Sequence, residues 1–435
     1  KDAVAAANGK VVLSYPRFDT AKGRVRFPSS FLLRAIEAAT GRRTKAEDLE
    51  ALALPGETGL GRAHPKTPDA AIDRIERDLA LVASGVRGAA AHLVAGGGTV
   101  ARACALDAAA WRPELTAYDG LVDVTTDSER FARLLLAGQR TSATGVQSFA
   151  ACPYRHLLER GFRLREWTEP EDVYQLDDGT WGSLYHDAVR RLFEWLRDEK
   201  ALPLKPADVP RAERESERLG DEAGEALVAE GRILNEKLLE PAKGKVRMEL
   251  AELLDREAEP DPDVFVPVLL EETYADLAVA IDEERSVTFG GKLDRVDARE
   301  RPRAVRVIDY KTGQFKWKEG ELFRGGRELQ LALYNEAVAA LQPGAEVAEA
   351  RYYHSTSAQR FKVKACPATA ETAATLRRVL RALDDTARAG AFPPVADTCD
   401  YCPFDAICGR FKRERAARKQ ADPRLAVFRS IREIP

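Results

Sequence analysis

The hydrophobic pattern divides the chain into a helical first part and a later part in which strands alternate with helices. Residues 10–15 form a short apolar run that predicts a strand. Ser29 and Ser30 precede the apolar run 31–38, and serine at that position caps a helix, so a helix is expected there. Residues 70–86 predict a further helix. We therefore expect residues 1–140 to be a mostly helical segment.

From about residue 141 the pattern changes. Residues 182–197 carry an apolar stripe at helical spacing, which predicts a helix that faces a core. Apolar and β-branched runs then predict strands over 266–273, 277–281, 286–298 and 304–310, a helix over 326–341, strands over 348–354 and 361–365, and a helix over 369–389. Strands placed between helices in this way predict an α/β core.

Two charged stretches interrupt or follow this core. Residues 200–262 are rich in Glu and Arg and lie between proline-rich segments, which predicts a surface insertion of solvent-exposed helices. Residues 409–435 hold nine Lys or Arg against three acids. This basic C-terminal tail, 416–435 in our division of the chain, predicts either a solvated helix or a contact with DNA or a partner.

The composition excludes few classes of protein. The 435 residues are 45% hydrophobic and 31% charged, with a net charge of −3, which is typical of a globular protein with two or three domains. No apolar run approaches the roughly 20 residues of a membrane span. The chain starts at Lys1 and its only methionine is Met248, so we expect the C-terminal portion of a longer gene product or a processed or tagged chain. The P-loop motif of ATPases does not occur in the sequence.

Four cysteines stand at the two ends of the later part. Cys399, Cys402 and Cys408 form a C-x2-C-x5-C pattern, and 246 residues separate Cys152 from Cys399. Such spacing predicts a metal or cluster site that closes the chain between 152 and 399, named here the cysteine clasp. The alternatives are small buried core residues, which we expect of Cys104 and Cys366, or disulfides, which the low cysteine density does not favour. We expect a reducing cytoplasmic location.

A second pattern suits phosphodiester hydrolysis with a divalent ion. That chemistry needs carboxylates for the metal and a cation near the developing charge. If residues 293–296 and 307–310 are adjacent antiparallel strands, Asp294 and Asp309 converge at one end. Side chains alternate along a strand, so Asp309 and Lys311 point to the same face.

Three further side chains fit the same site. His186 lies beside the stripe of the 182–197 helix and is a candidate metal ligand, although a lone histidine on such a helix is more often structural. Gln330 and Tyr334 share a helix face and are candidates to position a substrate phosphate or base. Their alternative roles are a surface glutamine and a core tyrosine.

These residues carry a family resemblance. Leu184-Tyr185-His186, Gly291 to Asp297, Asp309-Tyr310-Lys311-Thr312-Gly313 and Gln330 to Tyr334 resemble the motifs of the RecB branch of the PD-(D/E)XK nucleases. With the cysteine clasp, residues 141–415 are most similar to the iron-sulfur nuclease domains of AddB type. The resemblance implies a mixed sheet flanked by helices. It also implies that His186, Asp294 and Asp309 bind Mg²⁺ or Mn²⁺, that Lys311 is catalytic and supported by Gln330 and Tyr334, and that the clasp holds a 4Fe-4S cluster.

The resemblance extends more weakly upstream, where residues 13–17 and 23–29 are similar to the helicase-like part that precedes such nucleases. Residues 1–140 are therefore expected to be a helicase-like remnant or accessory segment. The function implied is a metal-dependent nuclease acting on single-stranded DNA or DNA ends in double-strand-break repair, with a helicase partner and no membrane. Two alternatives remain: a non-catalytic scaffold that binds DNA ends, and a stand-alone nuclease of the kind that trims DNA for CRISPR spacer acquisition.

Overall fold

The protein consists of two compact units, residues 1–105 and 106–435. The computed structural model describes residues 11–19, 24–50, 64–95, 99–123, 132–166, 176–233, 235–260, 263–314, 318 and 320–435. The boundary that the sequence suggested near residue 140 lies inside the second unit. None of the helices in these ranges is long and apolar enough to cross a membrane.

The first unit is mostly helical, as predicted. Its elements are β1 (Phe18–Asp19), β2 (Arg24–Val25), α2 (Ser30–Thr40), α3 (Arg74–Ala83), α4 (Ala89–Ala95) and the start of α5 (Thr99–Ala110). The Ser29 side chain caps α2 by accepting from the Leu32 N–H. The strand expected over 10–15 is not present at residues 11–15, and Lys10 lies outside the described residues. The helix expected over 70–86 is shorter because Asp73 caps α3.

The second unit is built on a mixed six-stranded sheet, which confirms the predicted fold class. Its strands are β3 (Arg140–Thr141), β4 (Val266–Ala280), β5 (Ser286–Arg299), β6 (Ala304–Tyr310), β7 (Glu346–His354) and β8 (Lys362–Pro367). The order is β3-β5-β6-β7-β8, with β4 also paired to β5. The β3–β5 and β6–β7 pairs are parallel and the others are antiparallel. The two strands expected over 266–281 are one strand, because a shift of register between Tyr274 and Leu277 absorbs the polar interruption.

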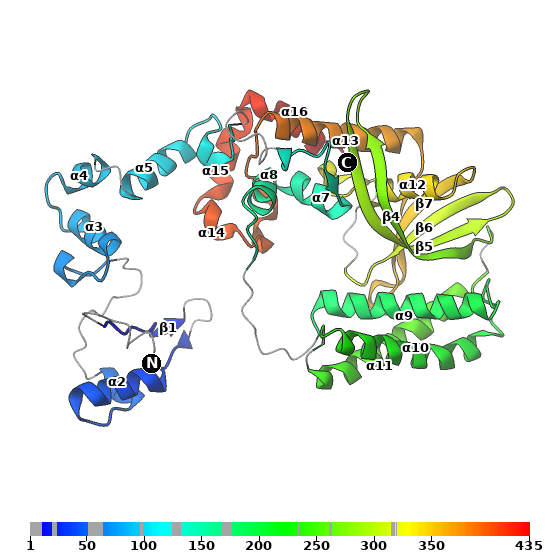
Figure 1. The fold of residues 1–435 in the computed structure, drawn as a ribbon, viewed down its shortest axis with the longest axis horizontal. Coiled ribbons are helices and arrows are strands. Elements are labelled where there is room, and N and C mark those ends of the chain that lie inside the picture. The colour runs from blue at the N-terminus through cyan, green and yellow to red at the C-terminus, as the bar shows by residue number, and fades with distance from the viewer. Residues whose placement is uncertain are drawn as a thin grey trace. The chain divides into compact units, whose positions relative to one another are not determined.

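Helices cover both faces of this sheet, and the alternation along β6 assigns the faces (Figure 1). Val305 and Val307 belong to a core shared with α7 (Ala143–Ala151), α12 (Gln330–Leu341), α13 (Ala370–Arg388) and α16 (Ala426–Arg432). Ile308 and Tyr310 belong to a second core shared with α9 (Asp178–Asp198), α10 (Val209–Ala229) and α11 (Leu239–Glu257). Asp309 therefore falls on the same side of β6 as Val305 and Val307.

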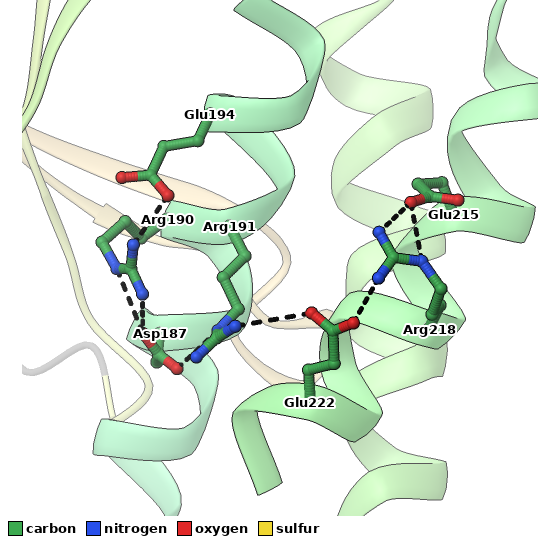
Figure 2. A network of polar contacts seen from close by, with 7 residues as sticks. All are labelled: Asp187, Arg190, Arg191, Glu194, Glu215, Arg218 and Glu222. Carbon is green, nitrogen blue, oxygen red and sulfur yellow. Dashed lines mark hydrogen bonds and ion pairs between the residues drawn. The ribbon is translucent and has the colours of Figure 1, made fainter. Parts of the chain in front are cut away.

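The charged stretch 200–262 forms α10 and α11, whose inner faces are more buried than the sequence suggested. Leu219, Leu227, Leu250 and Leu253 pack with α9 in the second core. Lys243 and Glu249 are buried. Other charged residues of α10 pair with one another and with α9, in the network of Asp187, Arg190, Arg191, Glu194, Glu215, Arg218 and Glu222 (Figure 2). The sequence analysis missed the apolar stripe of these helices because charged residues surround it. That stripe packs α10 and α11 against α9.

The residues expected as a basic tail are also packed. Phe428 and Ile431 of α16 are buried in the first core. Lys419, which follows α15 (Lys412–Arg418), is buried; its Nζ donates to three backbone carbonyl oxygens, those of Ala109, Arg112 and Glu114, and contacts Asp119. At the end of the chain, the N–H groups of Phe323 and Gly325 donate to the carbonyl oxygens of Pro435 and Ile434.

Candidate active site

The β5–β6 hairpin brings the two predicted aspartates together. Arg295 pairs with Ile308 in the antiparallel register, so Asp294 and Asp309 occupy the next step of the ladder. The Tyr310 N–H donates to Asp294 Oδ2 at 3.0 Å. The strand pairing on which the metal-site prediction depended is therefore present, and both carboxylates lie at one end of the hairpin.

Asp309 is buried and its two oxygens have different surroundings. Oδ1 accepts hydrogen bonds from the Tyr334 hydroxyl at 3.0 Å and from Gln330 Nε2 at 3.2 Å. Oδ2 accepts no hydrogen bond from the part of the chain that the structure describes, and it contacts the Lys311 ammonium in an ion pair. Burial raises the pKa of Asp309; Lys311 opposes this rise and Asp294 adds to it. A carboxylate in this position favours a second cation nearby.

Gln330 and Tyr334 come from the first turns of α12, one turn apart, and both reach Asp309. Gln330 Nε2 also lies 2.5 Å from the Tyr334 hydroxyl, and Gln330 Oε1 lies 3.4 Å from Lys311 Nζ. The predicted pair thus faces the carboxylate and the lysine directly. Gln330 is half-buried, and Tyr334 is buried in the first core with its hydroxyl turned to Asp309.

His186 approaches from the other side of the sheet, on α9. Its Nδ1 lies 3.3 Å from Asp294 Oδ2, and its side chain is partly exposed. Burial lowers the pKa of His186, but the hydrogen bond and charge of Asp294 outweigh burial and hold the pKa above its usual range. The imidazole and carboxylate are therefore placed as two ligands of one ion would be.

The sequence analysis missed a third candidate ligand beside them. Ligand atoms of His186, Asp294 and Glu271 lie within 4.8 Å of one another. Glu271 stands opposite Asp294, between the β4–β5 pairs Leu270–Arg295 and Glu272–Leu293, and has a backbone φ of 52°. The only sequence signal was an acidic pair inside an apolar strand. Asp309 is not in this group, so the predicted ligand set is divided between the three-residue group and the neighbouring ion pair of Asp309 with Lys311.

A cavity of about 780 Å³ opens at the three-residue group. Its lining residues are Gly179, Gly182, Ser183, His186, Asp187, Arg190, Arg191, Ala226, Leu227, Glu230, Arg232, Glu271, Lys292 and Asp294. Four of these side chains are cationic, and they lie on α9, on β5 and in the loop after α10. Four other lining residues are acidic, namely Asp187, Glu230, Glu271 and Asp294. Arg190 and Arg191 pair with Asp187, and Lys292 pairs with Glu271. The cavity is therefore a mixed-charge opening onto His186 and Asp294.

The clasp cysteines come together from both ends of the second unit. Cys152 lies between α7 and α8 (Pro153–His156). Cys399 lies within a short 3-10 helix (Ala396–Tyr401), Cys402 directly follows it, and Cys408 ends α14 (Asp405–Cys408). The Val395 N–H donates to Cys152 Sγ at 3.5 Å. Burial, together with the charges of Cys152, Cys402 and Cys399, raises the pKa of Cys408 to about 12. Thiols this close repel as anions, so a bound cationic centre would favour their thiolate forms.

Of the two cysteines predicted to be buried in the core, one is buried and one is not. No disulfide joins the six cysteines, all of which are described. Cys366 is buried in the core, as expected, whereas the prediction for Cys104 was wrong because that residue is exposed on α5. Beside the clasp, Phe404 is buried and Ile407 is half exposed.

Comparison with known proteins places this arrangement in a family. Residues 140–409 match the PD-(D/E)XK nuclease superfamily, and the chain belongs to it. The chain is similar to an ATP-dependent helicase/deoxyribonuclease subunit from Natranaerobius thermophilus, with 29% identity over 216 residues, 45% of this chain. It is also similar to the subunit of the same name from Heliobacterium modesticaldum, with 26% identity over 385 residues, 76% of this chain. The aligned regions span 17% and 30% of these relatives.

Proposed function

We propose that the protein is a metal-dependent deoxyribonuclease that hydrolyses single-stranded DNA or DNA ends during double-strand-break repair. The observation that carries the proposal is the placement of His186, Asp294 and Glu271 beside the buried Asp309, which pairs with Lys311. One imidazole and several carboxylates are suitable ligands for Mg²⁺ or Mn²⁺. The names of the relatives, which include deoxyribonuclease, support DNA as the substrate.

The chain's own residues have distinct parts in this proposal. His186, Asp294, Glu271 and Asp309 would hold the ion, which supplies an activated water and charge neutralisation. Lys311 keeps its ammonium at Asp309 Oδ2, where it neutralises negative charge that develops on a phosphate. Gln330 and Tyr334 fix the Asp309 carboxylate by holding Oδ1. Arginine and lysine side chains of the cavity wall, which also holds four acids, would contact the phosphates of the DNA backbone.

The test is cleavage of a labelled single strand with Mn²⁺ by the wild type, Asp309→Ala and Lys311→Ala. We expect both variants to lose cleavage while the melting transition remains cooperative. Lys237→Ala, which removes an exposed lysine in the short 3-10 helix before α11, is the matched control and should cleave normally. Full activity in Asp309→Ala would refute the assignment.

The same assay separates the alternatives. A scaffold that binds DNA ends would retard the strand in a gel and give no product with any divalent ion. Stimulation of cleavage by an ATP-driven helicase subunit would favour work with a partner, which the relatives' names suggest. Equal cleavage with and without that subunit would favour a stand-alone nuclease.

We further propose that the cysteine clasp holds a 4Fe-4S cluster. The fit rests on the gathering of four thiols from both ends of the unit. Among the described residues, no three cysteine sulfurs lie within 4.8 Å of one another. Zinc, with Zn–S bonds of about 2.3 Å, draws thiolates closer than that, whereas a four-iron cluster is itself larger. Protein purified without oxygen should be brown and contain iron; a colourless, zinc-loaded protein would overturn the cluster.

A further inference from the structure

Tyr352 stands between the two groups that the proposed chemistry requires to be fixed. It lies on β7 beside Asp309 of β6 in the parallel register, and its side chain is buried. Its hydroxyl is 3.1 Å from Gln330 Oε1. Its ring centroid is 4.7 Å from Lys311 Nζ. One side chain thus contacts both the lysine and the glutamine of the site.

The hydroxyl contact has a defined direction. Lys311 has only donors, so the oxygen of the Gln330 amide faces it, and the ionised Asp309 has only acceptors, so Nε2 faces Asp309. Tyr352 therefore donates to Oε1 and resists rotation of the amide. If the amide turned over, Asp309 Oδ1 would lose one of its two hydrogen bonds and Lys311 would face an NH₂ group.

The ring contact acts on the lysine. The face of an aromatic ring attracts an ammonium group, and the attraction strengthens where water is excluded. The ring of Tyr352 lies on one side of Lys311 Nζ while Asp309 Oδ2 and Gln330 Oε1 contact the same ammonium. These contacts together restrict a long side chain that would otherwise sample many rotamers.

We propose that Tyr352 is a positioning residue of the nuclease site, which orients the Gln330 amide through its hydroxyl and Lys311 through its ring. The inference rests on the proposed function, because the positions of Lys311 and Asp309 affect the reaction only if both residues take part in DNA hydrolysis. Tyr352 does not line the cavity that opens at His186. Its loss should therefore change the rate of the chemical step more than the binding of DNA.

Glu328 offers the hydroxyl a second acceptor, with Oε2 at 3.4 Å. The hydroxyl has one proton, and the shorter distance assigns it to Gln330. Glu328→Gln tests this assignment. It should leave cleavage close to that of the wild type, and a loss as large as that of Tyr352→Phe would show that the hydroxyl acts through Glu328 instead.

The experiment measures kcat and KM for a single-stranded oligonucleotide with saturating Mn²⁺. Tyr352→Phe keeps the ring and should lower kcat about tenfold, the effect of one hydrogen bond, with KM unchanged. Tyr352→Leu also removes the ring and should lower kcat further. Tyr353→Phe is the matched control, because the adjacent tyrosine packs with Tyr310 and Phe361 on the other face of the sheet. It should behave as the wild type does.

A double variant separates positioning from general destabilisation. In a Gln330→Ala background, Tyr352→Phe should cause no further loss, because the hydroxyl has lost the group it orients. Additive losses, or an unchanged kcat in Tyr352→Phe, would overturn the inference. Failure of the proposed function is a different result: wild type and Lys311→Ala would then be equally inactive.

Discussion

The Tyr334 hydroxyl of α12 donates a 3.0 Å hydrogen bond to Oδ1 of Asp309 on β6. A helix and a strand thus meet at a buried carboxylate whose other oxygen contacts a lysine that is about one-third exposed. Burial of the Asp309 carboxylate lowers the stability of the fold, because the partly solvated Lys311 ammonium compensates only in part for the lost hydration. Its cost should be measurable without any metal.

Asp309→Asn should raise stability in the presence of EDTA. The amide keeps the oxygen that Tyr334 and Gln330 contact, removes the buried charge, and leaves Lys311 free to extend into solvent. We expect a gain of about 1 to 3 kcal/mol. Lys311→Ala should instead lower stability by about 2 kcal/mol, since the carboxylate remains without its cation. Urea unfolding followed by circular dichroism measures both, and equal effects of the same sign would contradict the explanation.

Glu271→Gln should weaken Mn²⁺ binding by at least about tenfold, because an amide oxygen is a poorer ligand than a carboxylate. The matched control is Glu272→Gln, which changes the neighbouring acid, outside the three-residue group. Isothermal titration of each purified variant with MnCl₂ gives the affinities. Identical affinities for the two variants would remove Glu271 from the ligand set.

Cys152→Ala should lose iron and thermal stability together. If the cluster closes the 246-residue gap as a covalent crosslink does, its loss removes on the order of 5 kcal/mol. Cys104→Ala is the control, because Cys104 is exposed on α5 and outside the clasp. Iron content and the melting temperature are measured on anaerobic samples. A variant that melts at the wild-type temperature would show that Cys152 does not close the chain.

His156 should make the protein less stable in mild acid. Burial lowers its pKa from 6.5 to about 4, and its ring stacks on Phe149 with centroids 4.3 Å apart. As pH falls from 6.5 toward 4, the unfolded chain binds a proton that the folded chain does not, so stability falls. The loss approaches about 3 kcal/mol at the lower end. Melting temperatures from pH 7 to 4.5 should fall more steeply for the wild type than for His156→Phe, and parallel curves would refute this.

Local pattern was enough for much of the core. The strand 304–310 and the helix 369–389 were predicted almost to the residue, because alternation and helical periodicity survive in those segments. The β5–β6 pairing followed from two short strands with a tight turn between them. Predicted site residues such as Asp294 and Lys311 lie on or just after these strands, which explains why the site was recognisable.

Contacts between residues far apart in the chain could not be predicted from the sequence. Glu271 enters the site only through the register of β4 on β5, and one slipped residue would turn it to the other face. Lys419 looked like one more cation in a basic run, yet its partners are carbonyl groups some 300 residues earlier. Nothing in the local composition of residues 409–435 distinguishes a buried lysine from solvated ones.

The docking of the last residues onto the loop before α12 has a consequence for the order of events during synthesis. Ile431 and Ile434 fill the same core as Val146, and Pro435 receives the N–H of Phe323. The α9–α11 layer draws mostly on residues near one another in sequence, so it can assemble while the ribosome is still translating. The core that holds Asp309 and Gln330 closes only when α16 has emerged. We therefore expect the nascent chain to lack nuclease activity until translation has passed α16.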